Sequence, residues 1–127
     1  MKRFYLREIA HARAGDKGDT NNIGVIAYEP HYYPIILRHV TPERVRAHFG
    51  GIVKGPITRY ELPNVHAVNL VLEKALGGGV TRSLSVDPHG KSYSALILTM
   101  TVEVPDDLAI ELMERGRTPL AAESSEP

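Results

Sequence analysis

A run of polar residues near the start of the chain, Ala12–Asn22, carries the residue types best suited to chemistry. Within it, two glycines stand among alternating charges. Glycines let the backbone approach a ligand closely and present its N–H groups, and Arg13 and Lys17 could bind a carboxylate or a phosphate. Asp16 and Asp19 could instead hold Mg²⁺ or act as a general base. The alternative is a polar turn in which Asp and Asn side chains bond their own backbone.

The run matches neither of two common ion-binding motifs. A P-loop needs four residues between its glycines and a Gly-Lys-Ser/Thr ending, and these are absent. An EF-hand loop needs alternating Asp or Asn ligands and a distant Glu. Thr20, Asn21 and Asn22 then lead directly into an apolar stretch. These polar groups could hydrogen-bond within the protein, or Asn22 could contact a ligand.

A second candidate group lies on a predicted helix, Val65–Leu76, whose apolar residues recur at helical spacing. His66 and Asn69 are three residues apart, so on a helix they would share a face and could point together into a cleft. Histidine is the usual acid–base residue near neutral pH, which makes His66 a candidate catalytic residue beside Asp16 and Asp19. A purely structural histidine is the alternative.

Two arginines, Arg59 and Arg82, are further candidates for binding an anionic substrate, because a guanidinium group can hold a carboxylate with two hydrogen bonds. Arg82 follows three glycines at 77–79, more than the end of a helix requires. Such a run suggests close backbone approach to a ligand or to a neighbouring chain. The other histidines lack metal-site spacing and the chain has no cysteine, so we assign no metal ligand and no cofactor.

The elements that must position these residues follow an α+β order. Thr41 and Pro42 give the start signal of a helix, Asn64 gives another, and Asp87-Pro-His-Gly90 has the composition of a type I turn. Helices on one face of a mostly antiparallel sheet, a ferredoxin-like two-layer sandwich, are the predicted architecture. The sequence predicts strands at Phe4–Ala12, Ile23–Tyr28 and Pro56–Leu62, helices around His31–His39, Pro42–Phe49, Val65–Leu76 and Asp106–Arg115, and a hairpin of Val80–Val86 with Ser92–Val104.

The composition limits the class of protein. The 127 residues fit one domain, which we expect at 1–115, followed by a disordered tail at 116–127. Fifteen basic and fifteen acidic residues cancel, which argues against a nucleic-acid partner. No apolar run reaches the ~20 residues needed to cross a bilayer, so we expect no membrane association and a cytoplasmic location.

Three motifs in the same order resemble the small ferredoxin-fold domain of the AtuA family, the acyclic terpene utilisation proteins. They are Ala12–Ala27, Arg59–Asn69 and Ala75–Gly79, and the resemblance runs from about residue 4 to 104. In that family the domain follows a large N-terminal domain in one chain or is a separate small protein encoded beside it, and this chain looks like the separate form. Asn21 departs from the pattern, which favours Ala or Ser there.

The resemblance implies a role in bacterial catabolism of terpenoid and related branched acids, handled as acyl-CoA thioesters. The first hypothesis is therefore a small subunit of a two-part enzyme of the lyase or hydratase type, acting on a carboxylate or acyl-CoA substrate together with a large AtuA-type N-terminal-domain protein. The alternatives are a non-catalytic oligomeric assembly module and a self-sufficient small enzyme with an anion-binding site. The glycine content and the apolar predicted helix also suggest a homo-oligomer.

Overall fold

The computed structural model describes residues 1–75 and 92–121. The predicted strand at 80–86, its turn at 87–90, the triple glycine, Arg82 and residues 122–127 lie outside the described residues. The strands are β1 (Lys2–Tyr5), β2 (Ala10–Lys17), β3 (Thr20–Ala27), β4 (Ile57–Leu62), β5 (Ala67–Leu72) and β6 (Thr101–Val104); the helices are α1 (Tyr33–His39), α2 (Pro42–Phe49), α4 (Ser92–Ile97) and α5 (Asp106–Glu114).

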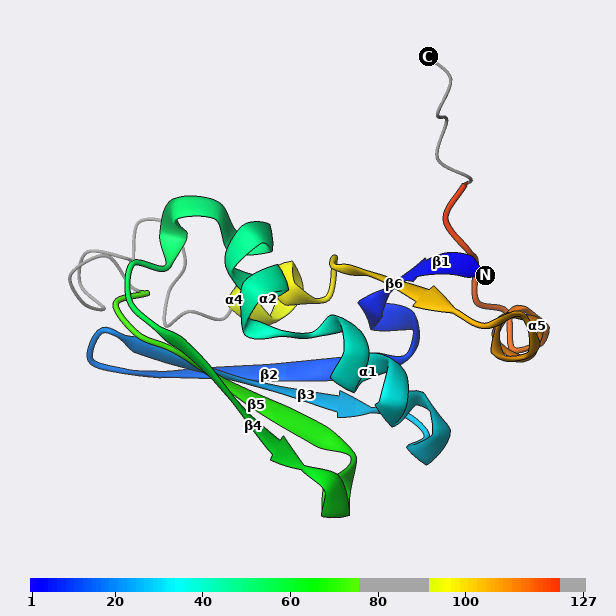
Figure 1. Ribbon diagram of the computed structural model, residues 1–127, viewed down its shortest axis with the longest axis horizontal. Helices are drawn as coiled ribbons and strands as arrows, with labels where there is room; N and C mark the ends of the chain where they lie inside the picture. Colours follow the sequence, from blue (N-terminus) through cyan, green and yellow to red (C-terminus); the bar gives the residue numbers. More distant parts are fainter. Residues whose placement is uncertain (76–91, 122–127) are drawn as a thin grey trace.

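The main sheet has four antiparallel strands in the order β2-β3-β5-β4, and β1 pairs with β6 in a separate antiparallel ribbon. Helices α1, α2 and α4 pack on one face of the main sheet, and none of the described helices covers the other face (Figure 1). This arrangement confirms the predicted α+β architecture, a ferredoxin-like fold with helices on one face of an antiparallel sheet. We call the uncovered side of the main sheet the open face.

The core lies between the helices and the inner face of the main sheet. Alternate residues of each strand point to that face, so the apolar positions of β3 and β5 recur at every second residue. Full burial of each such side chain stabilises the fold by roughly 1.5–3 kcal/mol. The fully buried members are Ile23, Val25, Val68, Leu70 and Leu72 from the sheet, and Ile36, Val45 and Ile97 from the helices.

The predicted helix at Val65–Leu76 is wrong. A turn at Pro63–Val65 is followed by His66 in the left-handed conformation (φ 56°, ψ 49°), and β5 begins at the next residue. The apolar run from Ala67 onward contains residues at both helical and strand spacing, and short runs of this kind are ambiguous. The strand forms because β5 pairs with both β3 and β4 through its whole length.

The predicted strand at Ser92–Val104 is also partly wrong. Its first half is α4, in which Tyr93 and Ile97 are four residues apart and are both buried. Its second half is β6, which pairs with β1. The predicted strand at Phe4–Ala12 is likewise divided by a 3-10 turn at Leu6–Glu8, so that β1 and β2 belong to different sheets.

Several other predictions are confirmed. Helix α2 has the predicted bounds, and its N-cap Thr41 accepts a hydrogen bond from the Arg44 N–H at 3.2 Å. Helix α5 ends one residue before its predicted boundary, and β4 begins one residue after its own. Within residues 1–75 and 92–121, every helix is too short or too polar to cross a lipid bilayer.

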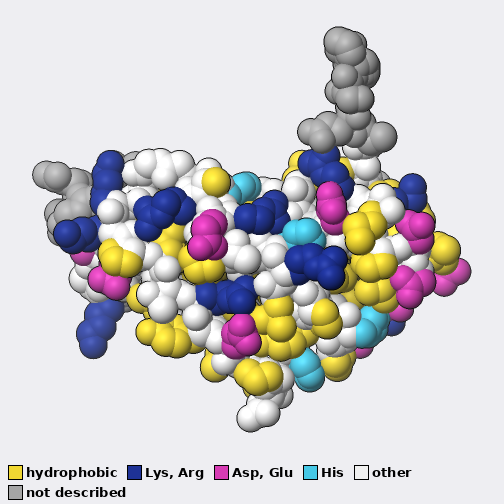
Figure 2. Space-filling model, in the orientation of Figure 1, with side chains coloured by type: hydrophobic (Ala, Val, Ile, Leu, Met, Phe, Trp, Pro, Cys, Tyr) yellow, Lys and Arg dark blue, Asp and Glu magenta, His cyan; other side chains and the backbone are white. Residues whose placement is uncertain are grey.

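The end of the described chain runs back along the β1–β6 ribbon. Residues 116–121 form no helix or strand, but the N–H of Leu120 donates to the carbonyl of Arg3 at 2.7 Å. Acidic side chains gather over α5, at the opposite end of the molecule from the β2–β3 turn (Figure 2). The domain limit at residue 115 and the disorder of the tail stay predictions.

Candidate functional site

The polar segment that sequence reasoning placed in a loop is a β-hairpin. Strand β2 continues to Lys17, which pairs with Thr20, and only Gly18 and Asp19 form the turn. Gly18 has φ 63°, and glycine at the first position of a two-residue turn is typical of a type II′ hairpin. Polar residues fit this strand because alternate side chains point to a face that none of the described helices covers.

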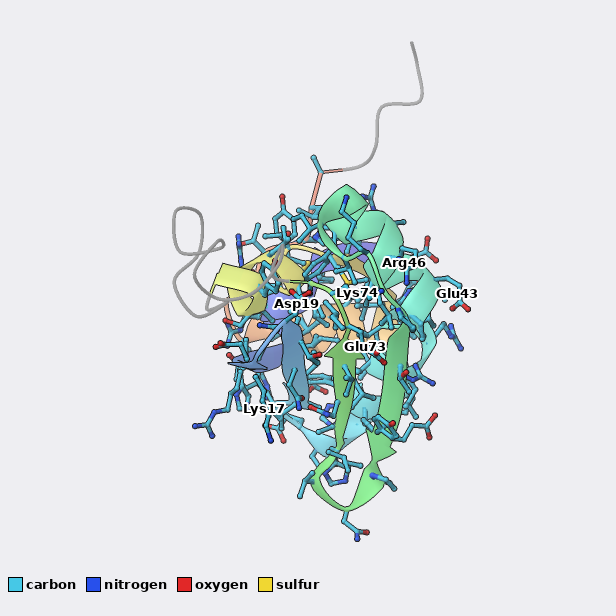
Figure 3. All side chains as sticks on the ribbon, turned by 90° about the vertical axis from the view of Figure 1, so that its left-hand side faces the viewer. Lys17, Asp19, Glu43, Arg46, Glu73 and Lys74 are labelled. Atoms are coloured by element: carbon cyan, nitrogen blue, oxygen red, sulfur yellow. The ribbon has the colours of Figure 1, made fainter. Side chains whose placement is uncertain are left out.

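Alternation divides the hairpin side chains between the two faces. In β3, Ile23 and Val25 are fully buried under the helices. Asn22 comes just before Ile23, so it points to the opposite face and is exposed on the open face. In β2, Arg13 pairs with Gly24 and therefore shares its face. Seen from the hairpin end, Lys17 lies on the side away from α2 (Figure 3).

These residues surround a hollow on the open face with a volume of about 740 Å³. Ten of the described residues line it: nine come from the β2–β3 hairpin, and the tenth, Asn69, comes from β5. The residues that line it are Arg13, Ala14, Gly15, Asp16, Lys17, Thr20, Asn22, Gly24, Ile26 and Asn69.

Two glycines form the floor of the hollow because they have no side chain to fill it. Gly15 pairs with Asn22, and a Cβ built on Gly15 would have no neighbouring atom within 4 Å. Gly24 pairs with Arg13 on one side and with Asn69 on the other. A glycine inside a strand often marks a place where a ligand comes close to the backbone.

The charges around the hollow favour an anion. Neither Arg13 nor Lys17 forms an ion pair within the part of the chain that the structure describes. The side-chain amides of Asn22 and Asn69 add hydrogen-bond donors to the same face. Asp16 is the one carboxylate among the described residues that line the hollow. Strand alternation directs its half-buried side chain to the face opposite that of Lys17.

Two of the three catalytic candidates lie outside this hollow. Asp19 is in the hairpin turn, where its carbonyl accepts a hydrogen bond from the N–H of Ala75 at 2.9 Å. His66 is in the β4–β5 turn and meets the ring of Tyr33 edge to face at 5.9 Å between centroids. Since residues 66–69 are not helical, His66 and Asn69 do not share a helix face.

Arg59 acts on the other side of the sheet. Its Nη1 donates to the carbonyls of Leu37 and Val40, at 2.8 and 3.0 Å, at the C-terminal end of α1. Its Nη2 bonds Glu61 at 2.9 Å. Free carbonyls at a helix end need such donors, so this arginine ties α1 to β4. Arg82 lies outside the described residues.

The predicted binding residues Arg13, Lys17, Asn22 and Asn69 thus lie around one hollow, together with Asp16. Sequence reasoning missed Gly24 and Ile26, which line the same hollow. The signal that could have found them is the two-residue turn at Gly18 and Asp19, because its length fixes the pairing of every residue in the hairpin. Among the described residues, no group of three His, Asp or Glu side chains is arranged to hold a metal ion.

Comparison with known protein families matches residues 4–103 to the AtuA ferredoxin-like domain. The chain belongs to the AtuA ferredoxin-like domain family. A search of curated proteins and a search of solved structures each found no match. All ten residues that line the hollow fall within the part that matches the AtuA ferredoxin-like domain. The family links the chain to AtuA-type proteins of acyclic terpene utilisation.

Proposed function

We propose that this AtuA ferredoxin-like domain is the small subunit, or accessory module, of a two-part bacterial catabolic enzyme of the lyase or hydratase type. In this role, the hollow on the open face holds the anionic end of a carboxylate or acyl-CoA substrate from terpenoid or branched-acid degradation. The observation that carries the proposal is the pair of cations, Arg13 and Lys17, which face one hollow without an ion-pair partner among the described residues.

An anion complements the two cations that line this hollow. Arg13 offers a planar fork that matches a carboxylate or phosphate, and Lys17 offers a mobile point charge. Hydrogen bonds between charged partners are roughly twice as strong as those between neutral groups. The amides of Asn22 and Asn69 can donate to the remaining oxygen lone pairs of the same anion, and the glycine floor leaves room for it.

The exposure of the hollow is our reason for proposing a second subunit. The hollow lies on the face that none of the described helices covers. In this proposal a second protein covers that face and excludes water from the bound substrate. Among the described lining residues, the one carboxylate is that of Asp16, which points to the face of β2 opposite Arg13 and Lys17. We therefore assign the covering surface, and the groups that carry out the chemistry, to the large AtuA-type N-terminal-domain protein.

The test is co-expression with a large AtuA-type protein, followed by affinity purification and mass determination of the complex. Turnover is then measured on a panel of enoyl-CoA and hydroxyacyl-CoA esters. We expect Arg13→Gln and Lys17→Gln to leave the mass of the complex unchanged and to lower turnover. Lys54→Gln is the matched control, since it removes one exposed charge away from the hollow.

Two outcomes would contradict the proposal. If the variants change the mass of the complex and turnover returns once assembly is restored, the chain is an assembly module. If no complex forms and the chain alone turns over the esters, it is a self-sufficient enzyme. The same mass measurement reports whether the chain associates with itself, as its glycine content suggests.

A further inference from the structure

The open face changes in polarity from one edge of the sheet to the other. A single row of paired residues crosses all four strands: Arg13 of β2 lies opposite Gly24 of β3, Gly24 lies opposite Asn69 of β5, and Asn69 lies opposite Tyr60 of β4. Directly paired residues in antiparallel strands share a face. The row therefore begins with a cation, continues over a glycine and an amide, and ends with an aromatic ring.

The neighbouring row ends in the same way. Ile26 of β3 lies opposite Ala67 of β5, and Ala67 lies opposite Leu62 of β4. Tyr60 is 54% exposed and Leu62 is 44% exposed, although both are large apolar residues. Exposed apolar side chains that adjoin one another often mark a binding surface, and here they adjoin the hollow through Ile26 and Asn69.

We propose that Tyr60 and Leu62 form an apolar subsite that continues the hollow, and that the ligand is an amphipathic carboxylate lying across the strands. Its carboxylate lies over β2, between Arg13 and Lys17, and its apolar chain lies over β4. This inference rests on the proposed function of the hollow as an anion site, and it adds the class of ligand and its direction.

The dimensions and charges of the open face support this ligand. Neighbouring strands are ~4.8 Å apart, so three strand spacings separate the cationic and apolar edges by about 14 Å. An anion without an apolar part would leave Tyr60 and Leu62 in water. A second copy of the chain placed on this face would bring two further uncompensated cations, Arg13 and Lys17, into the contact, which is unfavourable.

The proposal is tested by titrating the whole chain, without a partner protein, with acetate, hexanoate, octanoate and dodecanoate, because only dodecanoate is long enough to extend from β2 to β4. Binding is followed by calorimetry, and 1-hexanol is the matched ligand without a carboxylate. Between octanoate and dodecanoate we expect affinity to rise roughly two- to fourfold for each added CH₂, where the upper figure corresponds to complete burial of that group. We expect 1-hexanol to bind at least about tenfold more weakly than hexanoate, because it cannot form the charged hydrogen bonds.

Variants at the two edges of the sheet test separately the binding of the apolar chain and the binding of the carboxylate. Tyr60→Ser and Leu62→Ser should each reduce the gain per CH₂ between octanoate and dodecanoate and leave the affinity for acetate unchanged. Ile110→Ser is the matched control, because Ile110 is 53% exposed on α5, outside the main sheet. Arg13→Gln should weaken all four carboxylates by a similar factor. Far-UV circular dichroism establishes that each variant is folded.

Three results would overturn the inference. If octanoate binds as tightly as dodecanoate, the apolar subsite is wrong and the anion site stands. If no carboxylate binds, the anion site fails as well, whether or not the complex with a large AtuA-type protein forms. If Tyr60→Ser weakens that complex and leaves the gain per CH₂ intact, Tyr60 belongs to a protein interface.

Discussion

A Cβ placed on Gly24 of β3 would lie 4.0 Å from Oδ1 of Asn69 in β5, which is an ordinary van der Waals distance. We therefore expect Gly24→Ala to fold normally and to be more stable by about 0.5–1 kcal/mol, because glycine is entropically unfavourable inside a strand. The added methyl group occupies the floor of the hollow, so carboxylate affinity should fall at least a few-fold. Thermal unfolding and calorimetric titration measure the two effects.

Gly15→Val provides a stronger version of the same test, since nothing lies within 4 Å of a Cβ at Gly15 and valine favours strands. Gly51→Ala, outside the main sheet and equally open, is the control and should leave affinity unchanged. If both hollow variants bind carboxylates as the unmodified chain does, the ligand does not touch the glycine floor.

Arg59 should matter for stability and not for ligand binding. Its two hydrogen bonds to the carbonyls of Leu37 and Val40 involve a charged donor that is 18% exposed. We expect Arg59→Gln to lower the free energy of unfolding by about 1.5–3 kcal/mol, measured by urea denaturation, with carboxylate affinity unchanged. Arg38→Gln, an exposed arginine on α1, should change stability by less than about 0.5 kcal/mol. Loss of binding with unchanged stability would instead place Arg59 in the substrate site.

The buried amide of Asn21 should be a cost to stability. This side chain is fully buried, and within the described structure neither of its polar atoms has a hydrogen-bond partner. A buried polar group without a partner costs about 1–3 kcal/mol, and Asn21→Ala removes two of them while leaving a small cavity. We expect a net gain of about 1 kcal/mol in urea denaturation. Asn64→Ala, at an exposed turn position, is the control; a loss of stability in Asn21→Ala would mean that the amide has a partner.

His39 should make stability depend on pH. Burial, followed by the nearby charge of Arg44, lowers the pKa of His39 below its ordinary value of 6.5, and Nε2 accepts a hydrogen bond from the Glu103 N–H at 3.2 Å. Below pH 6.5 the unfolded chain takes up a proton that the folded chain resists, so stability falls as the pH drops toward the folded pKa. Unfolding curves at stepped pH should show this slope, His39→Gln should reduce it, and His11→Gln should keep it.

The sequence predicts an element well where nearby residues mark its ends, and poorly where pairing with distant strands decides between helix and strand. Helix α2 is predicted well because Thr41 and Pro42 mark its start within the chain itself. The region after Asn64 is predicted wrongly because Pro and Asn also form turns, and the apolar run that follows fits two spacings. Pairing with β3 and β4 decides between them, and those partners are distant in the sequence.

Some residues of the candidate site are likewise identified from the sequence alone, and others are placed only by strand pairing. Residue type alone identifies Arg13, Lys17 and Asn22 as candidates, and they line one hollow. The sequence predicts Asn69 on a helix face, but Asn69 lies at the hollow because it pairs with Gly24 of β3 in the sheet. Asp19 and Arg59 have equally suitable chemistry but lie elsewhere. A residue's type shows what it could bind, whereas strand register decides which face it occupies.

The β2–β3 hairpin supplies nine of the ten residues around the hollow, all within residues 13–26. A binding surface built from so short a stretch has a low contact order, since its residues are neighbours in sequence as well as in space. Mutations confined to this stretch could therefore change the cationic end of the proposed site without altering any residue of the helical layer.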